Sequence, residues 1–103
     1  MGRPYSQKFL LDLYRSTEEG LGSDLAKLCA ECNLPAMYVA KVAGVSRMTI
    51  YTWFRGGAIR SDLRPTVEAL VKILKEDIDA GVLPAKSGFE GKLYLEKLIE
   101  RTN

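Results

Sequence analysis

The side chains best suited to contacting nucleic acid are concentrated in one short stretch, residues 47–55. Five of them would share one face of a helix, and none of the five is a carboxylate: Arg47, Met48, Tyr51, Thr52 and Arg55. Guanidinium groups can pair with phosphates or guanine edges, and hydroxyl groups can hydrogen-bond bases or phosphates. The Met48 thioether or the Thr52 methyl can touch a thymine methyl. This pattern predicts a helix whose exposed face reads DNA.

The residues around this stretch predict how the helix is positioned. Ser46 is a good N-cap, because its hydroxyl can accept an N–H from the first helical turn, and this helix N-terminus is also expected to bind a phosphate. Ile50, Trp53 and Phe54 follow at helical spacing and are expected to be buried. We therefore interpret Trp53 as a core residue rather than a base-stacking one.

A second short helix is predicted immediately upstream, over residues 36–43. Its inner face would carry Val39, Ala40 and Ala43, with Ala40 small enough for another helix to cross closely. Gly44 lies between the two helices, where a bend requires a residue that tolerates positive φ or close backbone approach. Residues 35–56 are therefore predicted to form a helix-turn-helix.

These residues resemble the helix-turn-helix of the lambda-repressor-like (Cro/C1-type) regulators. The segments that carry the resemblance are Val39-Ala40, Ala43-Gly44-Val45-Ser46, Ile50 and Trp53-Phe54-Arg55-Gly56, with Leu21-Gly22, Leu25, Leu28 and Asn33-Leu34 upstream and Pro65, Leu70, Ile73 and Leu74 downstream. The resemblance covers roughly residues 21–75. The chain departs from the family pattern at Ala36 and Met37, where members often carry a polar residue, commonly Gln, that contacts a phosphate.

The resemblance implies an all-α, lambda-repressor-like domain with extra N-terminal and C-terminal helices. It implies a sequence-specific, double-stranded DNA-binding transcriptional regulator, with repression as the simplest output. Members commonly act as homodimers, whose recognition helices lie about 34 Å apart on a near-palindromic operator. A bacterial or phage protein working in the cytoplasm is the expected setting.

Charge supports the same location for the DNA-binding surface. The net charge of the whole chain is only +2, but residues 36–64 carry +4 and the remainder −2. Positive charge next to a reading helix is the electrostatic feature that a DNA-binding surface requires. Lys41, Arg60 and Arg64 are therefore further candidate phosphate contacts, with ordinary solvated side chains as the alternative for the two loop arginines.

Composition argues against several other classes of protein. There is no histidine, which removes the commonest general base, and no acidic cluster with catalytic spacing, so an enzyme is not expected. Cys29 and Cys32 are the only cysteines, too few for a four-ligand zinc site within one chain. We expect reduced, semi-buried thiols, no metal, no cofactor and no evident small-molecule ligand. No segment has the length and apolarity of a membrane span or the pattern of a signal peptide.

The chain divides into three parts. Residues 1–20 are expected to form an arm, holding Arg3, and a helix capped by Ser6 that runs to about Thr17. Residues 21–80 form the DNA-binding domain, with further helices at about 21–31 and 65–80, and residues 81–103 a connector and a helix from about Glu90 to Thr102. The apolar positions expected to face inward are Phe9, Leu10, Leu13 and Tyr14 in the first helix, Val67, Leu70, Val71, Leu74 and Ile78 in the helix at 65–80, and Leu93, Tyr94, Leu98 and Ile99 in the last. The last helix can bury its face in the chain's own core or against a second copy, and we favour the dimer.

Two further functions use the same sequence features. The chain could tether a larger complex to DNA, as an antitoxin, an excision factor or a packaging factor does, since a fold does not settle function. It could also be a protein-interaction module without DNA binding. The absence of carboxylates from the 47–55 face argues against this last alternative.

Overall fold

Six α-helices form the part of the chain described by the computed structural model, residues 4–17 and 19–102. They are α1 (Gln7–Arg15), α2 (Leu21–Glu31), α3 (Ala36–Ala43), α4 (Arg47–Phe54), α5 (Arg64–Asp79) and α6 (Gly88–Thr102). No strand occurs in these two ranges, so the predicted all-α class is confirmed. The expected N-terminal arm with Arg3 lies outside the described residues.

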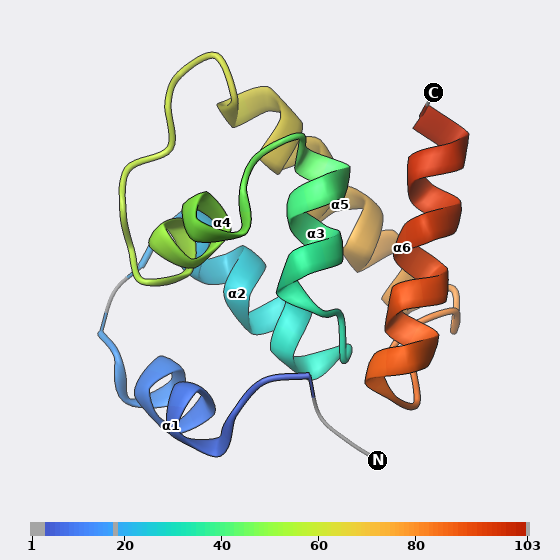
Figure 1. The fold of residues 1–103 in the computed structure, drawn as a ribbon, viewed down its shortest axis with the longest axis horizontal. Coiled ribbons are helices and arrows are strands. Elements are labelled where there is room, and N and C mark those ends of the chain that lie inside the picture. Colours follow the sequence, from blue (N-terminus) through green and yellow to red (C-terminus); the bar gives the residue numbers. More distant parts are fainter. Residues whose placement is uncertain (1–3, 18, 103) are drawn as a thin grey trace.

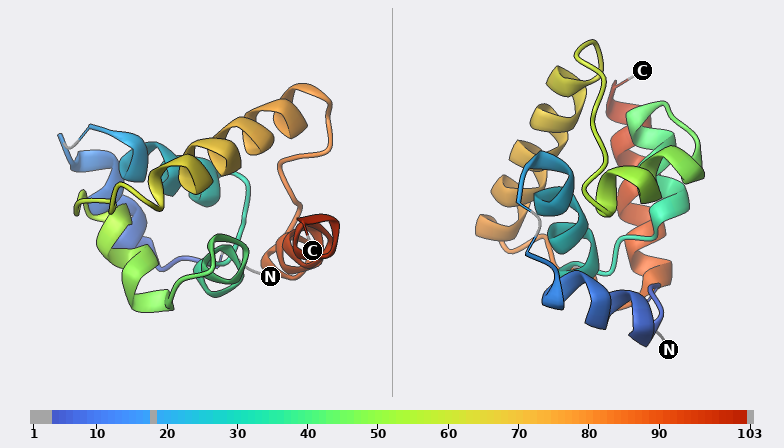
Figure 2. Two further views of the ribbon diagram at one scale, coloured as in Figure 1. Left: turned by 90° about the horizontal axis from the view of Figure 1, so that it is seen from above. Right: turned by 90° about the vertical axis from the view of Figure 1, so that its left-hand side faces the viewer.

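The short helix α3 occupies the middle of the molecule, with α4 on one side and α6 on the other (Figure 1). Seen from above, α4, α3 and α6 follow one another along one edge, while α2 and α5 lie behind them (Figure 2). Helix α1 packs against α2 at the opposite end from α6. The arrangement therefore presents α4, α3 and α6 side by side on one face.

Local sequence signals explain most helix ends. The hydroxyl of Ser6 caps α1 by accepting the Phe9 N–H at 3.1 Å, and that of Ser87 caps α6 by accepting the Glu90 N–H at 3.2 Å. After α2 the chain turns at Asn33, whose φ of 60° is left-handed, and after α5 it turns at Gly81 with φ of 80°. The expected helices were therefore correct to within two residues at each end.

The core lies between α2, α3, α4 and α5 and is closed by α6. The largest side chains with almost no exposed surface are Leu25, Leu34, Ile50, Leu74, Leu95 and Leu98. The inward positions expected in α5 are buried, apart from the partly buried Ile78. Two expectations were wrong: Tyr14 is 53% exposed and Leu93 is 42% exposed. Leu95 fills the core in place of Leu93, because α6 is rotated about its axis relative to the expected register.

The corner at residues 32–34 is the point where four segments meet. Tyr5 donates its hydroxyl hydrogen to the Leu34 carbonyl, Asn33 Nδ2 donates to the Ala85 carbonyl at 2.8 Å, and the Ala85 N–H donates to the Cys32 carbonyl at 3.1 Å. Helix α6 approaches the same corner so closely that a Cβ on Gly91 would lie 1.9 Å from the Asn33 carbonyl oxygen. Glycine at position 91 is therefore what allows α6 to dock.

Replacing Gly91 with alanine is expected to destabilise the protein by about 1–3 kcal/mol, because the added methyl group overlaps backbone that cannot move freely. Glycine to alanine in an unobstructed helix interior stabilises by about 1 kcal/mol, so the sign of the change reports the contact. The measurement is the free energy of unfolding from urea titration. Lys97→Ala, at an exposed position of the same helix, is the control, and a stabilised Gly91→Ala variant would contradict the close approach.

Candidate nucleic-acid interface

The turn between α3 and α4 has the backbone conformation that its sequence predicts. Gly44 has φ of 74° and ψ of 30°, in the left-handed region. The Val45 N–H donates to the Ala40 carbonyl at 3.0 Å, and the Gly44 N–H donates to the Lys41 carbonyl at 3.2 Å. These bonds satisfy carbonyl groups at the end of α3, as in a glycine C-cap. Two short helices are thereby joined by a fixed bend.

The N-terminus of α4 is capped as expected. Ser46 has extended backbone angles, and its Oγ accepts the Thr49 N–H at 3.1 Å. The two hydroxyl groups of Ser46 and Thr49 also lie 3.0 Å apart and share a hydrogen bond. The first turn of α4 is therefore ordered by its own cap.

One side of α4 is held by the core. Ile50, Trp53 and Phe54 are each at most 3% exposed, which confirms the expected inward positions. Helix α2 crosses α4 at Gly22, where a Cβ would lie 2.4 Å from the Trp53 carbonyl oxygen. This glycine lets α2 pack directly against the α4 backbone. The contact fixes the position of α4 on the core.

Helix α1 also supports α4, through aromatic side chains. Phe9 meets Tyr51 edge to face with ring centroids 5.7 Å apart, and the centroids of Phe9 and Phe54 are 6.2 Å apart. Tyr51 is consequently half-buried, whereas the sequence placed it fully on the outer face. Its ring helps to bind α1 to α4, so it offers the exterior less surface than expected.

The remaining candidates on α4 form its exposed face. Arg47, Met48, Thr52 and Arg55 are all exposed, with Met48 at 78%. Thr52 Oγ1 donates to the Met48 carbonyl at 3.0 Å, so an outside partner meets this hydroxyl as an acceptor. The Thr52 methyl group lies against Gly57, which leaves Met48 as the apolar side chain best placed to touch a ligand.

The positively charged candidates outside α4 differ in their surroundings. Arg60 pairs with Asp62 at 3.0 Å, and Arg64 pairs with Glu68 at 3.5 Å, both at exposed positions. Exposed pairs of this kind contribute little stability and can exchange partners. Lys41 is exposed on α3, with its Nζ 5.0 Å from the centroid of the Tyr38 ring.

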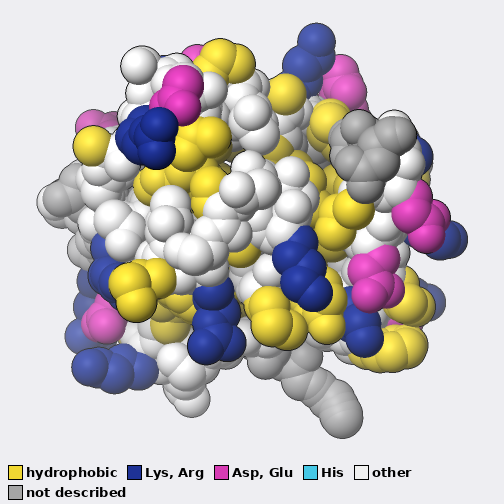
Figure 3. Space-filling view, turned by 45° about the horizontal axis from the view of Figure 1, so that its top comes forward, with side chains coloured by type: hydrophobic (Ala, Val, Ile, Leu, Met, Phe, Trp, Pro, Cys, Tyr) yellow, Lys and Arg dark blue, Asp and Glu magenta, His cyan; other side chains and the backbone are white. Residues whose placement is uncertain are grey.

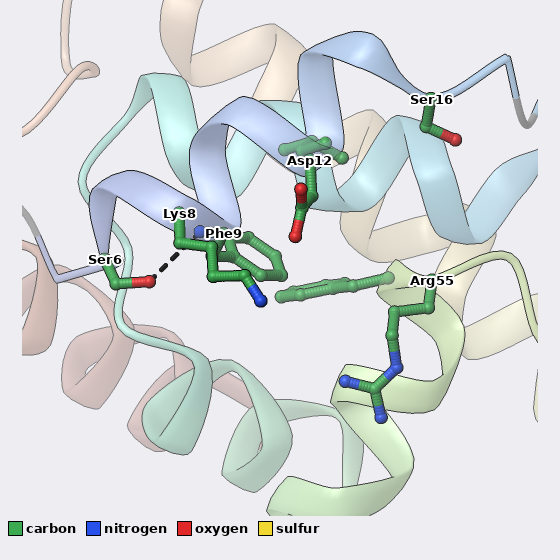
Figure 4. Close-up of a pocket in the computed structure, with 8 residues that line it drawn as sticks. Ser6, Lys8, Phe9, Asp12, Ser16 and Arg55 are labelled. Carbon is green, nitrogen blue, oxygen red and sulfur yellow. Dashed lines mark hydrogen bonds between the residues drawn. The ribbon is translucent and has the colours of Figure 1, made fainter.

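A cavity between α1 and the end of α4 is lined by Lys8, a cation that the sequence analysis missed. It has a volume of about 330 Å³ and is lined by side chains of α1 and of the serines that flank it, together with Phe54 and Arg55. Lys8, Asp12 and Arg55 are the charged residues that line it, so two cations and one carboxylate lie together here (Figure 4). Lys8 reaches this place through the docking of α1, which no local pattern in the sequence announces.

Lysine and arginine side chains lie across the face shown in Figure 3. Dark blue side chains are interleaved with yellow ones over its lower half, and several of the magenta side chains lie toward its edges. Positive and apolar groups therefore alternate over this part of the surface, with a few acidic side chains among them.

The two cysteines lie in the core rather than on this surface. Both are free and buried, and burial raises the pKa of the Cys32 thiol to about 11. Burial also raises the pKa of Cys29, so both are neutral thiols near pH 7. Neutral buried thiols are poor nucleophiles and poor metal ligands, and the expected semi-buried placement was an underestimate.

Replacing Ser46 with alanine is expected to reduce the free energy of unfolding by about 1 kcal/mol, because the Thr49 N–H loses its acceptor. Urea titration followed by circular dichroism measures the change. Ser46→Asp is the matched variant, since its carboxylate can accept the same bond and should keep most of the stability. An unchanged free energy of unfolding in Ser46→Ala would show that the cap contributes nothing.

The described residues contain neither a candidate membrane span nor a metal-binding cluster. No helix among them is long and apolar enough to cross a membrane, and no group of three or more Cys, Asp or Glu side chains is placed to hold a metal ion. No protein-family model, curated protein or solved structure matches the chain.

Proposed function

We propose that this protein is a sequence-specific, double-stranded DNA-binding transcriptional regulator, and most simply a repressor. The observation that carries the proposal is the carboxylate-free exposed face of α4, with Arg47, Met48, Thr52 and Arg55 pointing away from the core. The capped helix after a left-handed glycine bend supports the predicted helix-turn-helix. The lambda-repressor-like resemblance belongs to this same proposal.

In this proposal α4 enters the major groove. The groove of B-DNA is about 12 Å wide and admits one α-helix, whose side chains then reach the base edges. Arg47 and Arg55 pair with guanine edges or phosphates, and Met48 touches thymine methyl groups. Thr52 accepts a hydrogen bond from an exocyclic amine, because its own hydrogen is used by the Met48 carbonyl. Lys41, Arg60 and Arg64 contact flanking phosphates, the two arginines by exchanging their carboxylate partners.

In vitro selection from random duplexes tests the proposal directly. The purified protein should enrich one site, and affinity for that site should fall with salt at about −0.9 log units per log unit of salt for each phosphate neutralised. An enriched palindrome would show two copies reading two half-sites. No enrichment, together with salt-independent binding, would refute the proposed function.

Arg47 provides the sharpest test of base reading. Arg47→Ala is expected to weaken binding to the selected site by about 1–3 kcal/mol. Arg47→Lys keeps the charge but loses the bidentate fork, so it should keep affinity for random DNA while losing preference for the selected site. Titrations on both duplexes measure this, with Lys75→Ala, an exposed α5 residue beside α2, as control. Equal losses on both duplexes would reassign Arg47 to a phosphate.

The proposal includes pairing of two copies, for which α6 offers an apolar surface. Phe89 is 66% exposed and Leu93 is 42% exposed, one turn apart on this helix. The same observation also favours the alternative in which the chain tethers another protein to DNA. Light scattering of the free protein and of its DNA complex separates the two: two copies per palindrome support the regulator, whereas a single copy on an asymmetric site supports the tether.

A further inference from the structure

Two lysines from different helices converge on one tyrosine ring. Lys41 of α3 has its Nζ 5.0 Å from the centroid of the Tyr38 ring, and Lys92 of α6 has its Nζ 5.5 Å from the same centroid. Tyr38 is half-buried and packs against the core, so the ring is held in place. Lys41 and Lys92, which are 51 positions apart in the sequence, are thus brought together at the contact between α3 and α6.

The cluster concentrates positive charge without neutralising it. Neither lysine makes an ion pair with a carboxylate of the described residues, in which Arg60 pairs with Asp62 and Arg64 with Glu68. Glu96 lies one turn beyond Lys92 but does not reach it within ion-pair distance. The ring attracts both ammonium groups, so two positive charges lie within 5.5 Å of one ring centroid. Each ammonium also keeps N–H donors available, so an anion bound beside the ring would gain charge-assisted hydrogen bonds.

The position of the cluster indicates which anion this would be. Helix α3 lies between α4 and α6 and leads through Gly44 directly into α4 (Figures 1 and 2). A duplex with α4 in its major groove carries phosphates along both edges of that groove, beside the elements that flank α4. The lysines at the contact between α3 and α6 therefore stand on the side where a phosphate backbone would pass.

We propose that Lys41, Tyr38 and Lys92 form a binding site for DNA backbone phosphate, which makes α6 part of the DNA-contacting surface. This inference rests on the proposed DNA-binding function and extends it to a helix whose sequence carried no such assignment. Tyr38 acts by positioning the two ammonium groups. Because phosphates carry no sequence information, the contribution is the same on every duplex.

Lys92→Gln tests this site. Loss of one phosphate contact should lower affinity about five- to tenfold near 0.1 M salt and make the salt slope shallower by about 0.9. The loss should be equal on the selected site and on random duplex. Lys92→Arg should restore both quantities, since a cation remains over the ring.

Lys97→Gln is the matched control, because it removes the same charge from an exposed position on another side of α6. If Lys92→Gln folds poorly by circular dichroism, Lys41→Gln replaces it with the same expected slope. A wild-type protein that binds duplex while Lys92→Gln and Lys97→Gln behave identically would overturn this inference and leave the DNA-binding proposal intact. A wild-type protein that binds no duplex would overturn both.

Discussion

The eight residues of α4 are too few to form a stable helix in isolation, because isolated helices shorter than about 12–15 residues are marginal in water. Packing against other helices therefore provides the stability that α4 lacks because of its short length. Trp53 and Phe54 are buried against α2 and α1. At the Gly22 crossing the backbones of α2 and α4 approach each other directly. The rest of the fold follows from this requirement, since α1, α2 and α3 each contact α4 or the residues that bury it. The exposed Arg47 and Met48 side chains are then not needed to hold the helix in place.

The parts of the fold that were predictable from sequence depend on local chemistry. Ser46 and Gly44 act through their own backbone and nearest neighbours, so their types and spacing located the bend and both short helices. Buried positions in α4 followed from helical periodicity for the same reason. The outer residues of α4 were placed on one face by that periodicity, and Arg47, Met48, Thr52 and Arg55 are exposed as expected.

The errors concern rotations and contacts that distant segments determine. The register of α6 depends on the approach of Gly91 to the Asn33 carbonyl, so Leu95 rather than Leu93 is buried. Tyr51 is drawn inward by Phe9, which comes from a helix that the resemblance did not require. Lys8 and Lys92 escaped the sequence analysis because each gains its neighbours only through tertiary docking. Helical periodicity predicts which face of a helix is buried, but it does not predict which distant segment that face contacts.

The corner at residues 32–34 has a consequence for folding on the ribosome. The hydrogen bond from Asn33 to the Ala85 carbonyl spans 52 positions, and Leu95 and Leu98 close the core over α3 from still further along the chain. Since α6 is synthesised after α3, a nascent chain carries this short helix for some time before the segment that covers it has emerged from the exit tunnel. Helices of this length are unstable until they are covered. Helix α6 contacts α3, which leads into α4, so the packing of α3 is complete only once α6 is available. Incomplete chains that end before α6 should therefore compete poorly with the finished protein for its ligand.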